Sequence, residues 1–189
     1  MRSVCWVAIL LTACGRRDFD SVVDAPTLDS GPATCLTQDY DLAIPSGTFT
    51  YRLIPELHTF REAEASCTAD GAHLAVLDAP AELVELSAAI DMVALPPSRG
   101  SDVFIFLGVV QTDPSVVDAN WVDAFDRPFD MLLWGPGEPN DALGEERTGI
   151  LHQTYPRVAD YLTEPSNALC ECDQRPTGPL FRATVAMLP

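Results

Sequence analysis

The 189-residue chain contains no lysine, and its 11 basic residues, all of them arginine, are outnumbered by 28 aspartates and glutamates. The formal net charge at pH 7 is therefore −17. A surface this acidic repels a phosphate backbone, so we do not expect nucleic acid to be the partner. The charge is compatible with a location outside the cytoplasm, and with the binding of cations.

Common motifs of catalysis and of zinc binding are missing as well. The six cysteines include no C-x-x-C pair, which argues against a zinc knuckle or a thioredoxin-type redox motif. The three histidines show no H-E-x-x-H spacing, and no nucleophile-elbow motif presents a serine for attack. Glu145 and Glu146 are paired acids, but the sequence places no further carboxylate for general acid/base work. We therefore expect a binding protein and not an enzyme.

No apolar run is long enough to span a bilayer as a permanent helix, although the N-terminus has the features of an export signal. A basic residue and an apolar stretch occupy residues 2–11, and Leu11–Cys14 (LTAC) resembles the lipobox of bacterial lipoproteins. This pattern predicts that residues 1–13 are a signal peptide and that Cys14 is lipidated. By resemblance to enterobacterial sorting, Gly15 favours the outer membrane or cell surface. The alternative is an unprocessed N-terminus of a cytosolic protein.

The rest of the chain divides by composition. Residues 14–34 are rich in Asp, Ser, Pro and Thr, which predicts a flexible acidic tether because so few apolar side chains cannot build a core. One domain is expected over residues 35–175, followed by a C-terminal tail over 176–189. If the leader is removed and Cys14 carries lipid, the cysteines that remain are Cys35, Cys67, Cys170 and Cys172. Four cysteines can form two disulfides in three different pairings. Two disulfides are then expected in an oxidising compartment.

Local patterns predict both helices and strands. Thr59 and Glu62 have the spacing of a capping box, which predicts a helix over about 60–70. Pro80 favours the start of a second helix, whose apolar residues recur at helical spacing. Alternation over 48–54 predicts a strand with one buried face. The apolar run 103–110 predicts a strand buried on both faces.

The segment 111–149 is rich in Asp, Asn, Gly and Pro, with aromatic residues between them. A loop segment of this length in a compact domain is usually functional. We expect Trp121, Trp134 and Phe106 to belong to the core, and His73 to have a structural role. Glu171, between two cysteines, is expected to point outward from the last strand.

Taken in order, these features resemble the C-type lectin-like family over about residues 35–175. The sharpest of them is the tract WGPGEPND, and the matching segments are Thr59–Cys67, Gly71–Val76, the helix with Glu82, Phe106–Val109, Trp121–Ala124, Trp134–Asp141 and Leu169–Glu171. The resemblance implies an α+β fold in which two helices flank small antiparallel sheets, with a long loop-rich region. It also implies a disulfide between Cys67 and Cys170, so that Cys35 pairs with Cys172 by default. The second common bridge of the family is absent, because Thr148 and about Thr163 stand where its cysteines would be.

The resemblance also implies a ligand site. In calcium-binding C-type lectins the peptide bond before the proline of the E-P-N motif is cis, and the Glu and Asn contact both the ion and two sugar hydroxyls. Carboxylate and amide oxygens suit calcium, which takes six to eight oxygen ligands. The residues expected to hold one calcium ion are Glu138, Asn140, Glu146 and Asp160, with Asp141 a weaker candidate. The E-P-N order resembles the mannose/glucose/fucose type, and we expect Glu138, Asn140 and Glu146 to bind the carbohydrate.

Some positions depart from the family pattern. Ala159 stands where the family has an Asn, which removes one ligand of calcium and one sugar contact, and Val158 replaces the usual Trp. Arg147 is a cation beside Glu146 and opposes calcium if it points inward. The expected function is calcium-assisted binding of glycans or glycoconjugates by an exported protein that meets the membrane only through its lipid anchor. The alternative is a calcium-independent module, on the same scaffold, for binding a protein.

Overall fold

The computed structural model describes residue 35 and residues 40–46, 49–116, 119–142, 144–162, 164–173 and 175–189. The expected signal peptide, the lipidation site Cys14, the tether and Thr163 lie outside the described residues. Within the described part of the chain, no helix is both long enough and apolar enough to cross a membrane.

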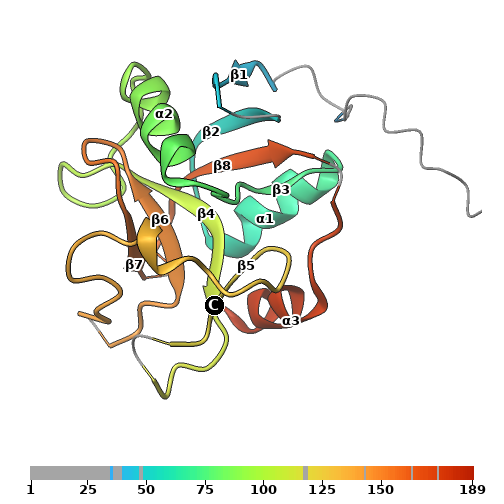
Figure 1. Cartoon of the computed structure of the whole chain (residues 1–189), viewed down its shortest axis with the longest axis vertical. Helices are drawn as coiled ribbons and strands as arrows, with labels where there is room; N and C mark the ends of the chain where they lie inside the picture. Colours follow the sequence, from blue (N-terminus) through green and yellow to red (C-terminus); the bar gives the residue numbers. More distant parts are fainter. Residues whose placement is uncertain are drawn as a thin grey trace, which may run out of the picture. The chain divides into compact units, whose positions relative to one another are not determined.

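Eight strands form one sheet, in the order β1-β2-β8-β4-β6-β7, with β3 added on β8 and β5 on β4 (Figure 1). The strands are β1 Leu42–Ala43, β2 Thr50–His58, β3 His73–Leu74, β4 Phe104–Gln111, β5 Trp121–Asp123, β6 Thr148–His152, β7 Val158–Tyr161 and β8 Ser166–Cys172. All pairings are antiparallel except the one between β4 and β8, which is parallel. The α+β class is confirmed, but the strands form a single mixed sheet where small antiparallel sheets are expected.

The two predicted helices are present. α1 (Phe60–Ala69) begins at Thr59, whose side chain and that of Glu62 form the reciprocal capping box. α2 (Pro80–Asp91) has its proline in the first turn, where the missing N–H costs no hydrogen bond. Local sequence signals are therefore sufficient to place both helices.

The apolar run of β4 is buried because each face of the sheet has its own core. Phe106 and Val110 pack with α1, whereas Ile105, Leu107 and Val109 pack with α2. Alternate residues of a strand point to opposite faces, so both faces of β4 must be apolar. Trp121, Trp134 and Phe106 are buried in these cores, as predicted.

The prediction for Glu171 is wrong. Its side chain is fully buried, because both faces of β8 are covered: Ala168 and Cys170 belong to one core and Leu169 to the other. Glu171 Oε2 accepts a hydrogen bond from the backbone N–H of Val76 at 2.9 Å. Since both faces of β8 are packed, this carboxyl group is part of the interior.

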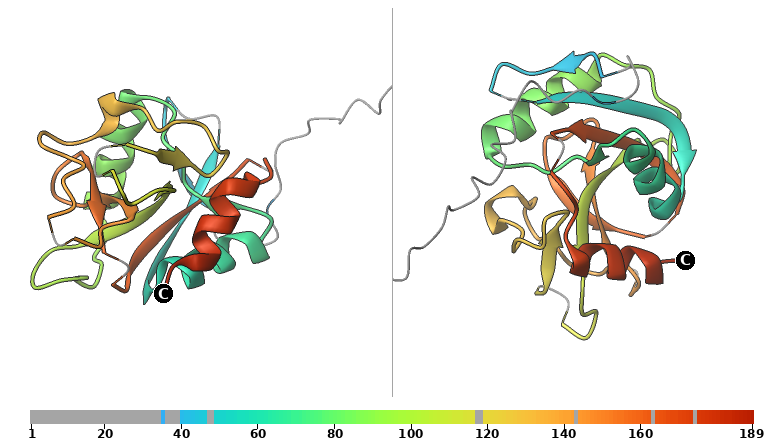
Figure 2. Two further views of the ribbon diagram at one scale, coloured as in Figure 1. Left: turned by 90° about the horizontal axis from the view of Figure 1, so that it is seen from below. Right: turned by 90° about the vertical axis from the view of Figure 1, so that its right-hand side faces the viewer.

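The C-terminal segment 176–189, expected as a tail, contains a third helix, α3 (Pro179–Met187). Phe181 is fully buried and its ring lies 6.3 Å from that of Phe60 in α1. α1 and α3 lie side by side in Figure 2. The segment is therefore an integral part of the domain core.

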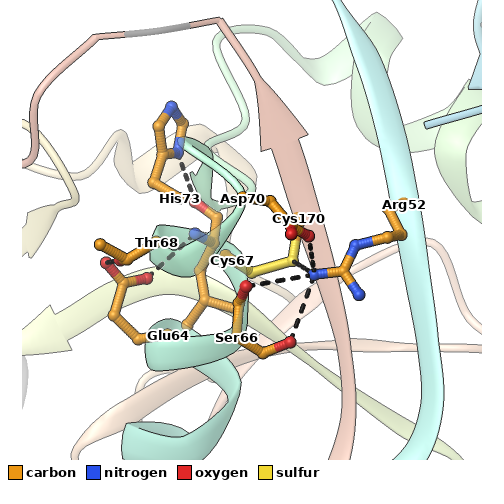
Figure 3. The surroundings of a disulfide bond; sticks show 9 residues. Arg52, Glu64, Ser66, Cys67, Thr68, Asp70, His73 and Cys170 are labelled. Atoms are coloured by element: carbon orange, nitrogen blue, oxygen red, sulfur yellow. Dashed lines mark hydrogen bonds and ion pairs between the residues drawn. A yellow bond between two sulfur atoms is a disulfide. The ribbon is translucent and has the colours of Figure 1, made fainter. Parts of the chain in front are cut away.

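Both implied disulfides are confirmed. Cys35 bonds to Cys172 and Cys67 bonds to Cys170. Figure 3 shows Arg52 beside the second bridge, where its guanidinium pairs with Asp70 at 2.8 Å. The bridges fasten α1 and the first described residue to the same strand, β8.

Candidate ligand-binding site

The site is built where the E-P-N loop meets the β6–β7 hairpin. The loop is anchored by Trp134, whose buried indole lies 5.0 Å from the ring of Trp121 and 5.1 Å from that of Phe129. The next residue, Gly135, donates its backbone N–H to the carbonyl of Val158 at 2.8 Å. The aromatic core thus positions the start of the loop beside β7.

The Glu138–Pro139 peptide bond is cis, as the resemblance predicts. The side chains of Glu138 and Asn140 lie on the same side, with Asn140 Nδ2 donating to Glu138 Oε2 at 2.6 Å. This contact leaves Asn140 Oδ1 for a ligand. Two adjacent oxygen-bearing side chains therefore project together from the loop.

Asp160 holds the same loop from β7. Its carboxylate accepts the backbone N–H of Asn140 at 3.0 Å and that of Asp141 at 2.7 Å. Glu146 Oε2 accepts the N–H of Ala142 at 2.7 Å, and the N–H of Glu146 donates to Asp141 Oδ1 at 3.0 Å. The carboxylates that the sequence predicts as ligands thus also fix the backbone between them.

Four of the five predicted metal ligands line one cavity of about 430 Å³: Glu138, Asn140, Glu146 and Asp160. Asp141 is not part of its wall, because its side chain caps the backbone at Glu146. Ala159 lines the cavity at the position where a further amide oxygen is missing. Arg147 is exposed and lines a different hollow with Leu188, so it does not face the four ligands.

Electrostatics in the cavity favour a bound cation. Partial burial, a hydrogen bond with Asp160 and the charges of Asp160 and Glu146 together raise the pKa of Glu138 to about 7. Arg157 opposes this effect. Carboxylates close enough to shift each other's ionisation are stabilised by a positive charge between them.

The donor set fits calcium in chemical type, although it is sparse. Hydrogen-bonded carboxylate oxygens keep a second lone pair, so Asp160 and Glu146 can accept both an N–H and an ion. Among the described residues, no three His, Cys, Asp or Glu side chains converge as a ready-made metal centre. An ion held here would depend on the amide of Asn140, on backbone oxygens and on water or sugar oxygens as well.

Sequence reasoning missed the basic side chains of the cavity. Arg99 and Arg157 line it, as does His152, whose pKa is lowered by burial. The imidazole is therefore neutral at pH 7, and the two guanidiniums are the cations of the wall. The available signal was the position of Arg157, in the hairpin that carries Asp160.

Solved structures share the fold of this domain. The C-type lectin CEL-I from Cucumaria echinata is 14% identical, with a TM-score of 0.56 over 74% of this chain and 98% of its own. The murine dendritic cell inhibitory receptor 2 lectin domain, solved with an N-glycan, is 22% identical, with a TM-score of 0.52 over 71% and 96%. The domain has the C-type lectin-like fold. No family model and no curated protein sequence matches the chain.

The C-type lectin-like fold does not determine the ligand. A calcium-independent type II antifreeze protein is as similar as the sugar binders, at 20% identity and a TM-score of 0.55 over 74% of this chain and 95% of its own. At these identities the likeness shows the fold alone. The ligand must be inferred from the residues of the cavity.

Proposed function

We propose that the domain binds glycans, with the help of calcium, in the cavity between the E-P-N loop and the β6–β7 hairpin. The observation that supports this most strongly is the convergence of Glu138, Asn140, Glu146 and Asp160 on one cavity. Asp160 comes from β7 and the other three from the segment before β6, and the cis bond turns the first two to the same side. Hydrogen bonding of adjacent sugar hydroxyls needs such a pair.

Each residue has a chemical role in this proposal. Glu138 would accept a hydrogen bond from one hydroxyl, and Asn140 Nδ2 would donate to the next. Calcium, when bound, would supply positive charge and accept lone pairs of the same hydroxyls. Asp160 would keep the loop backbone in place, and Glu146 would add a further oxygen. Adjacent equatorial-like hydroxyls, as in mannose, glucose or fucose, fit this spacing.

A second candidate function is a calcium-independent module that binds a protein. It is favoured by the hydrogen bonds from Asp160 and Glu146 to backbone N–H groups, which hold the loop without an ion. Ala159 favours it too, because it removes one oxygen from the expected shell. The two candidates differ in their response to calcium.

Thermal melting with and without calcium tests the proposal. A ligand that binds only the folded state adds about 2.7 kcal/mol at roughly a hundredfold excess over its Kd. We expect the melting temperature to rise with millimolar calcium, and we expect Glu138→Gln to abolish the rise. Glu145→Gln is the matched control, since this exposed acid lines another hollow.

If wild-type melting is indifferent to calcium, calcium assistance is wrong and the protein-binding alternative is favoured. A glycan array with and without chelator then separates the sugar from the ion. Glycans that bind only in calcium support the proposal, and an array without signal contradicts it.

We also propose that the protein is exported and held by lipid on Cys14, with a tether over 14–34. Both disulfides support export, because such bonds persist in oxidising compartments. The domain would then stand off the membrane surface, with its cavity open to glycans outside the cell.

A further inference from the structure

Two arginines line the cavity without forming an ion pair with any carboxylate in the described part of the chain. Arg52, Arg127 and Arg175 each make an ion pair with an aspartate, at 2.8 Å, 2.6 Å and shorter range. Arg99 and Arg157 make no such contact with any described carboxylate. Arg61, Arg147 and Arg182 also make no ion pair with a described carboxylate, but none of them lines this cavity.

Arg157 is held in place in spite of this. A Cβ added to Gly135 would lie 2.7 Å from Arg157 Cδ, so the stem of the side chain packs directly on the loop before Glu138. The guanidinium carbon lies 5.3 Å from the ring centroid of Tyr155. A side chain fixed by packing loses little entropy when it binds, which is the property of a preorganised ligand contact.

The guanidinium also has an unsatisfied donor. Arg157 Nε is buried and has no hydrogen-bond partner in the described part of the structure. A buried donor without a partner costs free energy, and more so when it is charged. The planar fork of an arginine matches the two oxygens of a carboxylate or sulfate.

The carboxylates of the cavity do not form an ion pair with Arg157, so neutralising their charge does not explain its position. It influences the ionisation of Glu138 but makes no ion pair with it. Asp102, another acid on the wall, faces His152, with Oδ1 4.0 Å from Nε2. Calcium would offset the carboxylates further, and the guanidinium would still have no ion-pair partner beside its contact with the Tyr155 ring.

We infer that the glycan bound in this cavity carries an anionic group, a carboxylate or a sulfate, which Arg157 binds, with Arg99 as a second cation on the cavity wall. This inference rests on the proposed glycan site and names its ligand class: acidic sugars such as uronic acids or sulfated hexoses. Glu138 and Asn140 bind the adjacent hydroxyls, and Arg157 selects the charged substituent. Arg157 is thus a specificity-determining residue.

Titration calorimetry of the full chain in millimolar calcium tests it with three probes. Methyl α-glucoside, methyl α-glucuronide and the 6-sulfate of methyl α-glucoside have the same ring hydroxyls and differ only at carbon 6. We expect an anionic probe to bind about tenfold more tightly than the neutral one, since one charge-assisted contact has this magnitude. A gain for the glucuronide alone or the sulfate alone identifies the anion.

Arg157→Gln keeps most of the stem and removes the charge. We expect it to bring the ratio of anionic to neutral affinity close to one. The ratio is the readout because Arg157 also lowers the pKa of Glu138, so its loss can weaken the binding of every probe. Arg99→Gln should reduce the ratio less. Arg147→Gln is the control, because this arginine lies outside the cavity and should leave the ratio intact.

Two outcomes overturn the inference, and they are distinguishable. If wild type binds neutral and anionic probes equally, or if Arg157→Gln leaves the preference intact, the anionic ligand is wrong and the glycan site stands. If no probe binds in the presence of calcium, the inference fails together with the proposed function.

Discussion

At the scale of single residues, the interior contains a charged network that composition does not suggest. His73 is fully buried, with Nδ1 2.8 Å from the carbonyl of Leu74 and Nε2 2.7 Å from Asp173 Oδ1. Burial lowers the pKa of His73, but the hydrogen bond and charge of Asp173 raise it above its ordinary value overall. Desolvation raises the pKa of the neighbouring Glu171 to about 7.

These shifts predict a fall in stability as pH rises. Between about pH 4.5 and 7 the folded protein keeps a proton on Glu171 that the unfolded chain releases, so unfolding becomes easier as pH rises through 7. The raised pKa of His73 acts in the same direction above pH 6.5. One such group contributes at most about 1.4 kcal/mol per pH unit.

Glu171→Gln should remove the contribution of Glu171. The amide is neutral at every pH and can still accept the N–H of Val76. We expect wild type to lose more stability than the variant between pH 5 and 8, measured by urea unfolding at several pH values. If the free energy of unfolding changes equally with pH in wild type and variant, the pKa of Glu171 is not raised by folding. Glu145→Gln, at an exposed side chain, is the control and should match wild type.

The ligand residues and the arginines show what sequence can reveal at this scale. Glu138 and Asn140 could be predicted because a contiguous motif carries them. For Arg157 the only sequence signal was its place in the hairpin of Asp160, because its packing against Gly135 is a tertiary contact that the sequence does not show. Glu171 was misplaced for the same reason, since its burial depends on the cores that cover both faces of β8.

At the scale of elements, α1, α2 and β4 are predictable because their signals are local. The capping box, a proline in the first turn and an uninterrupted apolar run each specify one element. α3 has no capping side chain of its own. Its first turn is capped from a distant loop, where Asp126 accepts the N–H groups of Leu180 and Phe181 at 3.0 and 2.7 Å.

A sequence signal for α3 was nevertheless available. Phe181, Val185 and Leu188 have the spacing of one helical face, and all three are buried with α1. The interpretation as a tail overlooked this periodicity after Pro179. Tertiary capping explains why the usual start signal is missing.

Phe181→Ala should therefore destabilise the whole domain and not only its C-terminus. Removing a fully buried phenylalanine costs about 3 to 5 kcal/mol. We expect a loss of this size in denaturant unfolding, whereas Met187→Ala, at a side chain 74% exposed, should cost little. A loss below about 1 kcal/mol for Phe181→Ala would show that α3 is dispensable for the core.

At the scale of the whole molecule, two disulfides bring distant parts of the chain to β8. The bridge from Cys67 to Cys170 spans 103 positions, and that from Cys35 to Cys172 spans 137. Loops of this length contribute about 4 to 5 kcal/mol each in the chain-entropy model. Cysteine spacing alone left three pairings open, and only the family resemblance selected the one that the structure has.

The E-P-N loop is held by hydrogen bonds and not by a disulfide. Thr148 stands where the family has a cysteine, and its hydroxyl donates to the carbonyl of Tyr161 at 3.1 Å. The loop is held mainly by the carboxylates of Asp160 and Glu146. A ligand bound in the cavity should therefore order this loop more than it would order a loop that a disulfide already holds.

Lipid attachment predicts how the whole protein distributes in the cell. Cys14→Ala should release it from the membrane fraction, because a single-cysteine anchor is then lost. Cys5→Ala is the matched control, since this cysteine lies in the proposed signal peptide and the variant should therefore stay membrane-bound. Fractionation with detection of the chain measures both, and non-reducing electrophoresis checks that the two disulfides form in each variant. If the Cys14 variant stays with the membrane, or if the wild-type disulfides are absent in the cell, the export and lipid-anchor proposal is wrong.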